Sequence, residues 1–77
     1  MMHLWDQAMV QAFNKYMGQP ASPQTFYRIK KEIVRIMRDV HKLEIQAADV
    51  HRIKVEPRDD GAVNLVVPPN LLAPSIH

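Results

Sequence analysis

The chain has 77 residues, of which 47% are hydrophobic and 23% are charged, a length that allows one small domain with a single core. It contains no cysteine, which excludes disulfide bonds, thiolate metal sites and cysteine nucleophiles. Ten Lys and Arg against eight Asp and Glu give a net charge of +2, which favours an anionic partner only weakly. Because no stretch has the roughly 18 apolar residues of a membrane span and no secretory signal is evident, we expect a protein without membrane contact, located in the cytoplasm or in a particle assembled there.

The first segment, residues 3 to 17, has the pattern of an amphipathic helix. Its apolar side chains recur at steps of three and four residues: Trp5, Met9, Ala12, Phe13 and Tyr16. Gly18 favours the left-handed conformation that ends a helix, and Pro20 prevents the helix from resuming. The segment therefore predicts a helix with a well-defined end.

A second helix is predicted from Pro23 to Lys42 or Leu43. Ser22 is a good N-cap because its hydroxyl can accept a backbone N–H, and Pro23 suits the first helical position, which needs no N–H. A heptad-like apolar seam follows: Phe26, Ile29, Ile33, Ile36, Val40 and Leu43. Further apolar residues widen this face beyond what one neighbouring helix would cover, so the helix is expected to contact additional structure.

Cations lie on the opposite side of this helix from the seam: Arg28, Lys31, Arg35, Arg38 and Lys42. They fall within an arc of roughly 80° and span roughly 20 Å, enough to follow several phosphates of a nucleic acid. Lys and Arg also fill ordinary exposed helix positions, so a solvated face is the alternative interpretation. The acidic Asp59 and Asp60, and the lack of aromatic residues between the cations, count against nucleic acid.

After Leu43 the apolar period changes to that of β-strands. Residues 50 to 56 and 62 to 67 each have one predominantly apolar face: His51, Ile53 and Val55 in the first, and Val63, Leu65 and Val67 in the second. Between them, Pro-Arg-Asp-Asp-Gly at residues 57 to 61 has the composition of a turn. The pattern predicts a β-hairpin with two open edges, and residues 44 to 49 are either a short strand or a connection.

Residues 68 to 77 combine prolines with large aliphatic side chains. Proline cannot donate to a β-ladder, so this segment is predicted to be an extended tail. Its apolar side chains indicate docking, either on the helices of its own chain or in a groove of a partner protein. The residues expected to contact a partner are Leu71, Leu72 and Ile76.

The sequence lacks the residue patterns of a catalytic or metal site. The four histidines are far apart and none has the i, i+4 spacing with which a helix binds zinc. With two glycines in the chain, a glycine-rich phosphate loop is excluded. We therefore expect no enzymatic activity, no cofactor, no metal and no small-molecule substrate.

These patterns predict an α+β fold in which an N-terminal two-helix hairpin is followed by a β-hairpin and an extended proline-rich tail. Residues 1–67 form a single small domain and residues 68–77 form a docking tail. The residues predicted to form the core are Trp5, Phe13, Ile29, Ile33, Ile36, Val40, Ile53 and Leu65.

Open strand edges, a wide apolar helix face and an apolar tail favour a small structural or adaptor subunit that assembles with copies of itself or into a larger complex. A component of a phage-like virion would have these properties. The alternative is a small nucleic-acid-binding protein that uses the five cations of the second helix, with the β-hairpin placed like the wing of a winged helix-turn-helix.

Overall fold

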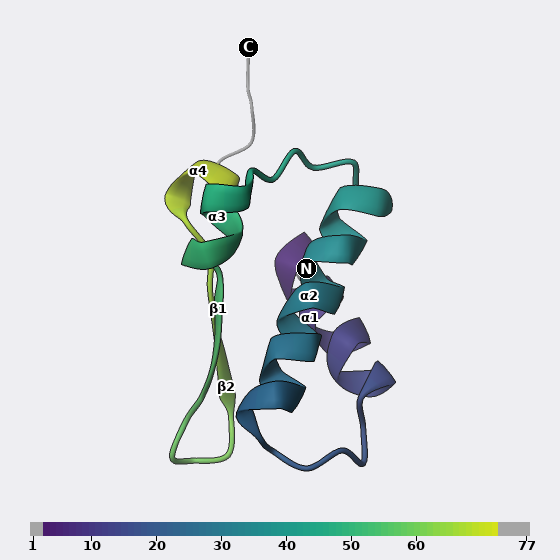
Figure 1. Cartoon of the computed structure of the whole chain (residues 1–77), viewed down its shortest axis with the longest axis vertical. Coiled ribbons are helices and arrows are strands. Elements are labelled where there is room, and N and C mark those ends of the chain that lie inside the picture. Colours follow the sequence, from purple (N-terminus) through teal and green to yellow (C-terminus); the bar gives the residue numbers. More distant parts are fainter. Residues whose placement is uncertain (1–2, 73–77) are drawn as a thin grey trace.

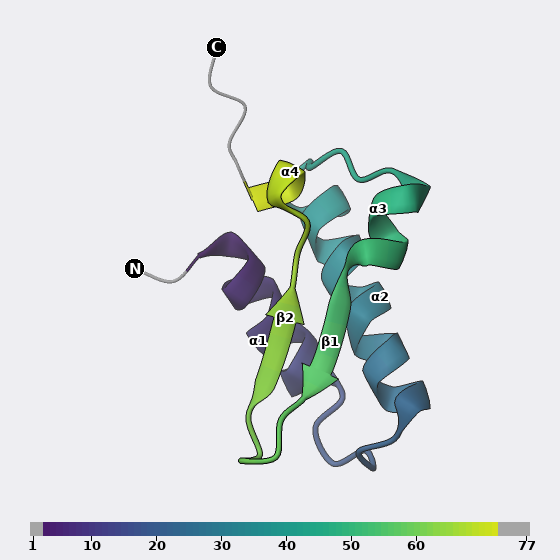
Figure 2. The same cartoon turned by 90° about the vertical axis from the view of Figure 1, so that its left-hand side faces the viewer.

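The computed structural model describes residues 3–72, which form the predicted α+β fold (Figure 1). In chain order the elements are α1 (Leu4–Lys15), α2 (Pro23–Asp39), α3 (Ala47–Arg52), β1 (Lys54–Pro57), β2 (Val63–Val66) and α4 (Pro69–Leu72). The helical hairpin of α1 and α2 forms one layer, and the two-stranded antiparallel sheet lies against it. Figure 2 shows β2 in front of α1, with β1 nearer to α2.

The helical hairpin forms largely as predicted because its caps are local. The Nδ1 atom of His3 accepts a hydrogen bond from the backbone N–H of Trp5 at 3.2 Å, which caps α1. The hydroxyl of Ser22 accepts from the N–H of Thr25 at 3.3 Å, and Pro23 occupies the first turn of α2. The first helix ends at Lys15, two residues earlier than predicted, with Tyr16 as its C-cap. Gly18, with a positive φ of 91°, lies in the turn that follows.

The second helix is shorter than predicted, because it ends at Asp39 rather than at Lys42 or Leu43. Lys42 has a φ of 57°, which takes the chain out of the helical path. The N–H of Leu43 then donates to the carbonyl oxygen of Met37 at 2.9 Å. This turn redirects the chain toward α3.

The core lies between the two layers. Five predicted core residues are buried there: Trp5, Ile29, Ile33, Ile36 and Ile53. Phe13 and Leu65 are half-buried and pack against them. The prediction for Val40 was wrong, because the early end of α2 leaves this side chain 61% exposed. Ala8 and Ala12 are fully buried, and such small side chains let α1 approach α2 closely.

The predicted strand over residues 50 to 56 is wrong in its first half. Residues 50 to 52 belong to α3, and the strand begins at Lys54. At the start of α3, the carboxylate of Asp49 accepts a hydrogen bond from the backbone N–H of Gln46 at 3.4 Å. The inward side chains of the alternating pattern are Ile53, which lies just before β1, and Val55, which lies within it.

The β-hairpin pairs Lys54 with Val66, Val55 with Leu65, Glu56 with Asn64 and Pro57 with Val63. Its second strand is shorter at both ends than the predicted residues 62 to 67. The turn is held by Asp60, whose carboxylate accepts from the guanidinium of Arg58 at 2.9 Å and from the N–H of Ala62 at 3.0 Å. Gly61 supplies the positive φ that this turn requires.

The prediction of an extended tail from residue 68 is wrong for Pro69–Leu72, which form the helical turn α4. Proline is favoured at a first helical position, and the N–H of Leu71 donates to the carbonyl oxygen of Pro68 at 2.9 Å. Leu71 is buried in the main core. Ile76, predicted to contact a partner, lies outside the described residues.

Candidate binding surfaces

The five cations predicted on one face of α2 are all exposed, but they do not form one free stripe. Arg28 and Lys31 lie on the first half of the helix, and the Nζ atom of Lys31 is 5.6 Å from the centre of the Tyr27 ring. Lys42 lies beyond the end of α2 in a left-handed conformation. Arg35 and Arg38 each have a partner within the chain.

The partner of Arg35 is Glu32, a buried acid on the same helix. Two Arg35 nitrogens donate to the two carboxylate oxygens of Glu32, at 2.9 and 2.6 Å, and Lys15 of α1 donates to the same carboxylate at 3.2 Å. The hydrogen bond from Arg35, supported by that from Lys15 and by both positive charges, outweighs the cost of burial and lowers the pKa of Glu32 to about 2. Arg35 therefore takes part in joining α1 to α2.

The partner of Arg38 is the backbone of the segment that follows α2. Its guanidinium donates to the carbonyl oxygen of Ile45 at 2.6 Å, and the side chain of Ile45 is buried. A charged donor to a carbonyl oxygen is among the stronger hydrogen bonds in proteins. Arg38 therefore holds the connection between α2 and α3.

The tail residues predicted to contact a partner have different environments. Leu71 is buried, and its carbonyl oxygen accepts a hydrogen bond from the indole N–H of Trp5 at 3.3 Å. Leu72 is 46% exposed. The amide of Asn70 donates to the carboxylate of Asp49 at 3.4 Å, which ties α4 to α3. The tail thus docks on its own chain up to Leu71 and then presents an apolar side chain outward.

Leu72 borders a cleft of about 720 Å³ at the end of the molecule where α4 meets the start of α1 and the segment after α2. Leu4, which is 45% exposed, lies at the same cleft. The remaining lining residues are His3, Trp5, Met37, Lys42, Leu43, Glu44, Gln46, Asn70 and Leu71. The lining therefore combines apolar side chains, two of them half-exposed leucines, with the charged side chains of Lys42 and Glu44.

A second hollow, a groove of about 490 Å³, runs between the first half of α2 and β1. Its lining is continuous along the strand and mostly apolar: Ala21, Ser22, Pro23, Phe26, Tyr27, Lys30, Ile53, Lys54, Val55, Glu56 and Pro57. Two lysines, Lys30 from the helix and Lys54 from the strand, therefore meet at one groove.

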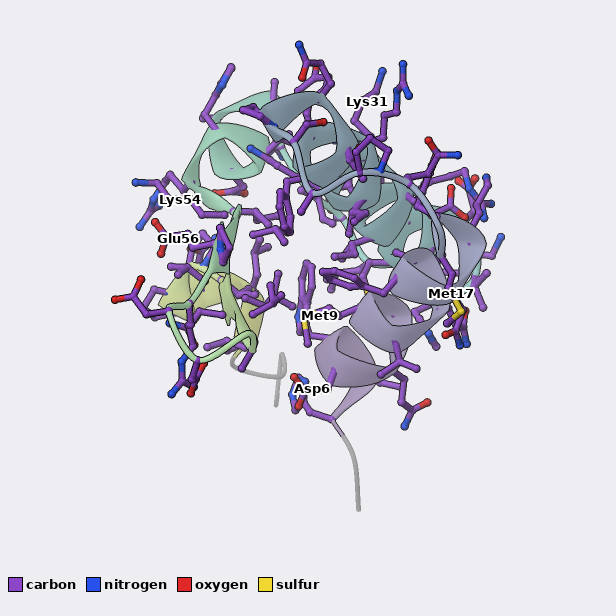
Figure 3. All side chains as sticks on the ribbon, turned by 90° about the horizontal axis from the view of Figure 1, so that it is seen from below. Asp6, Met9, Met17, Lys31, Lys54 and Glu56 are labelled. Atoms are coloured by element: carbon purple, nitrogen blue, oxygen red, sulfur yellow. The ribbon has the colours of Figure 1, made fainter. Side chains whose placement is uncertain are left out.

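Lys30 is half-buried and makes no ion pair with any of residues 3–72. Its pKa is lowered, first by burial and second by the positive charge of Lys54. A third cation, Lys31, follows it on the helix. Figure 3 shows Lys31 on the outer side of α2, and Lys54 and Glu56 on the side of the hairpin that faces away from α1.

The comparisons with known proteins give no match. No family model, no curated protein and no solved structure is significantly similar to this chain. The binding surfaces are therefore interpreted from their own chemistry.

Within residues 3–72, no three His, Asp or Glu side chains are grouped so that they could hold a metal ion. No helix in the same described part of the chain is both long enough and apolar enough to cross a membrane.

The groove between α2 and β1 was not predicted from the sequence. Lys30 is not among the cations of the predicted basic stripe, and Lys54 lies in the segment predicted as the first strand. The two are 24 positions apart in the chain, and only the packing of β1 against α2 brings them together.

Proposed function

We propose that this protein is a small non-enzymatic structural or adaptor subunit that assembles with copies of itself, within a larger complex such as a phage-like particle. The observation that supports this best is the cleft at the α1–α4 end of the molecule. Leu4 and Leu72, from opposite ends of the described chain, expose nearly half of their side chains at its border.

The composition of this region is that of a protein interface. Apolar side chains line it together with the polar Lys42, Glu44 and Asn70, and specific interfaces between proteins combine apolar and polar side chains in this way. A stable interface needs about 800 Å² from each partner. The total accessible surface of the chain is 5599 Å², so such an interface would cover about one seventh of it. An interface of this area would extend from the cleft over the neighbouring helix ends.

Light scattering after size exclusion tests this proposal on the full chain, whose mass is 8.9 kDa. We expect a mass that is a multiple of this value and falls on dilution. Leu72→Asp places a charge among the apolar side chains of this region and should give a monomer. Met17→Asp is the matched control, because Met17 is 76% exposed at the other end of α1 and its change should leave the mass unaltered. A wild-type chain that stays monomeric up to about 1 mM would contradict self-assembly.

Nucleic-acid binding is the second candidate, and the exposure of all five predicted cations favours it. Since Arg35 and Arg38 already have partners, Arg28, Lys31 and Lys42 are the side chains available to phosphates. Three phosphate contacts predict a slope of about −2.7 in a plot of log K against log salt concentration, and five predict about −4.5. Fluorescence anisotropy with a labelled DNA duplex measures this slope, and binding that is undetectable at low salt would exclude this function.

A further inference from the structure

The groove between α2 and β1 has a shape suited to an extended chain. It follows β1 along its whole length, since every residue from 53 to 57 contributes to its lining. Phe26, Ile53 and Val55 give it an apolar floor, and Tyr27 stands exposed at its border. The groove lies away from the cleft at the α1–α4 end, with which it shares no lining residue.

The edge of β1 that does not face β2 has no neighbouring strand in the described part of the chain. The N–H of Arg58 bonds to the carbonyl oxygen of Ala62 at 2.8 Å, and hydrogen-bonded pairs alternate along an antiparallel ladder. The backbone groups of Glu56 and Lys54 therefore point toward β2, and those of Val55 and Pro57 point toward the open edge. Val55 thus offers one N–H and one C=O to an added strand, and Pro57 offers a C=O.

The charges at the groove are unbalanced. Lys30 and Lys54 lie close enough to repel each other, and within residues 3–72 neither has an acidic partner. Glu56, on the same strand face as Lys54, is the one acid among the lining residues and makes no ion pair within this part of the chain. An anion held between the two lysines would offset their repulsion.

We propose that this groove binds an extended acidic segment of a partner protein, which joins the open edge of β1 as a third strand. The backbone of this segment forms hydrogen bonds with Val55, and its alternate aliphatic side chains pack on Phe26 and Val55. A carboxylate of a residue between two of these aliphatic residues lies near Lys30 and Lys54. Strand addition of this kind takes affinity from the backbone and specificity from alternate side chains. The protein would then join two partners, with copies of itself at one end and an acidic segment at this groove.

An acidic peptide fits these residues better than a nucleic acid does. The floor is aliphatic apart from Phe26, whereas single-stranded nucleic acids need successive aromatic rings on which bases can stack. Glu56 at the groove would also repel a continuous phosphate backbone, whereas a peptide can carry an uncharged side chain at that position.

The proposal is tested by titrating the protein with a blocked eight-residue peptide of alternating valine and glutamate. Binding is followed by the chemical shifts of the protein's backbone amides in NMR spectra. The shifts should be largest at Val55, Lys30 and Tyr27. Replacing each glutamate by glutamine should weaken binding at least threefold. N-methylation of every second peptide residue, on the edge that faces β1, should abolish it because those N–H groups can no longer bond to Val55 and Pro57.

Protein variants separate the charge at the groove from the general charge of the helix. Lys30→Gln and Lys54→Gln should each weaken binding of the acidic peptide about threefold to tenfold. Lys31→Gln is the matched control, because Lys31 is the next residue on α2 and does not line the groove, and its effect should be less than twofold.

Several outcomes would overturn the proposal: no shifts at about 1 mM peptide, equal binding of the glutamine peptide, an equal effect of Lys31→Gln, or displacement of the peptide by a labelled oligothymidine. Repeating the titration with Leu72→Asp keeps the two proposals apart. A monomeric variant that still binds the peptide supports the groove whatever the result for self-assembly.

Discussion

The indole N–H of Trp5 donates a hydrogen bond to the carbonyl oxygen of Leu71 at 3.3 Å, across 66 positions of the chain. Both residues are buried in the same core. The bond joins the first turn of α1 to α4, so the segment predicted as a separate docking tail is anchored to the domain. Trp5 and Leu71 also line the cleft at which Leu4 and Leu72 are exposed.

Trp5→Phe tests how much this anchor stabilises the fold. The change keeps an aromatic ring but removes the N–H, which leaves a buried carbonyl oxygen without this donor and a small cavity. We expect the free energy of unfolding to fall by about 1–3 kcal/mol. Urea unfolding followed by circular dichroism measures it, since Trp5 is the one tryptophan available for fluorescence. Leu72→Ala, at an exposed position of α4, should cost less than about 1 kcal/mol, and equal losses would contradict a special role for the bond.

Glu32 makes the stability of the protein dependent on pH in the acid range. Its pKa is lowered from 4.5 to about 2 by the hydrogen bonds and charges of Arg35 and Lys15. Because the folded-state pKa lies below the unfolded value, the stabilisation is complete above pH 4.5 and is lost as the pH falls toward 2. Glu32→Gln should therefore lower the free energy of unfolding by about 1–2 kcal/mol at pH 7, and much less at pH 2.

The measurement is urea unfolding of both proteins at several pH values between 2 and 7. Asp39→Asn is the matched control. Its carboxylate is exposed and 3.8 Å from Arg35, so its removal should cost at most about 0.5 kcal/mol. A difference between wild type and Glu32→Gln that does not change with pH would show that the carboxylate does not contribute through its charge.

Arg38 is expected to be a structural residue. Arg38→Ala removes the donor that holds the carbonyl oxygen of Ile45 and should lower the free energy of unfolding by about 1–2 kcal/mol. Arg28→Ala, on an exposed turn of the same helix, should change it by less than about 0.5 kcal/mol. Thermal unfolding of the two variants distinguishes these values. If the two variants are equally stable, Arg38 does not stabilise the fold and its side chain is available to a partner.

Lys42 is in a left-handed conformation that costs a residue with a side chain roughly 1–2 kcal/mol, whereas glycine adopts it freely. Lys42→Gly should therefore leave stability unchanged or raise it by up to about 1 kcal/mol, despite the flexibility that glycine adds to the unfolded chain. Gly18→Ala is the opposite experiment, because its φ is 91° and no atom lies within 4 Å of an added Cβ. It should cost about 1 kcal/mol through backbone conformation alone, as measured by chemical denaturation.

Local sequence patterns predicted the helical hairpin well. Ser22 and Pro23 start α2, and Gly18 adopts a positive φ in the turn after α1, through bonds and dihedral angles that involve neighbours in the chain. The apolar seam likewise placed Ile29, Ile33 and Ile36 in the core, because side chains three and four residues apart share a helix face in any helix. The turn residues Asp60 and Gly61 predicted the hairpin for the same local reason.

The errors arose where a short segment has two acceptable conformations. Residues 50 to 52 alternate as a strand does, yet they continue α3, where the carboxylate of Asp49 accepts hydrogen bonds from the Gln46 backbone and from Asn70 of α4. Val40 continues the heptad pattern, yet the chain turns at Lys42 and leaves it in solvent. Neither decision can be read from periodicity, because the first depends on side-chain hydrogen bonds of Asp49 and the second on the backbone conformation of Lys42.

The sequence by itself determined the order of the two long helices and the β-hairpin, the start of α2, the main core stripe and the positions of the cations. Only the tertiary structure decided which cations are free, since Arg38 is held by a backbone carbonyl and Arg35 by an acid that also binds Lys15 of another helix. It also decided that Lys30 and Lys54 share a groove and that Leu4 and Leu72 share a cleft. The physical reason is that caps and periodicity act between neighbours in the chain, whereas binding surfaces are formed by side chains that only packing brings together.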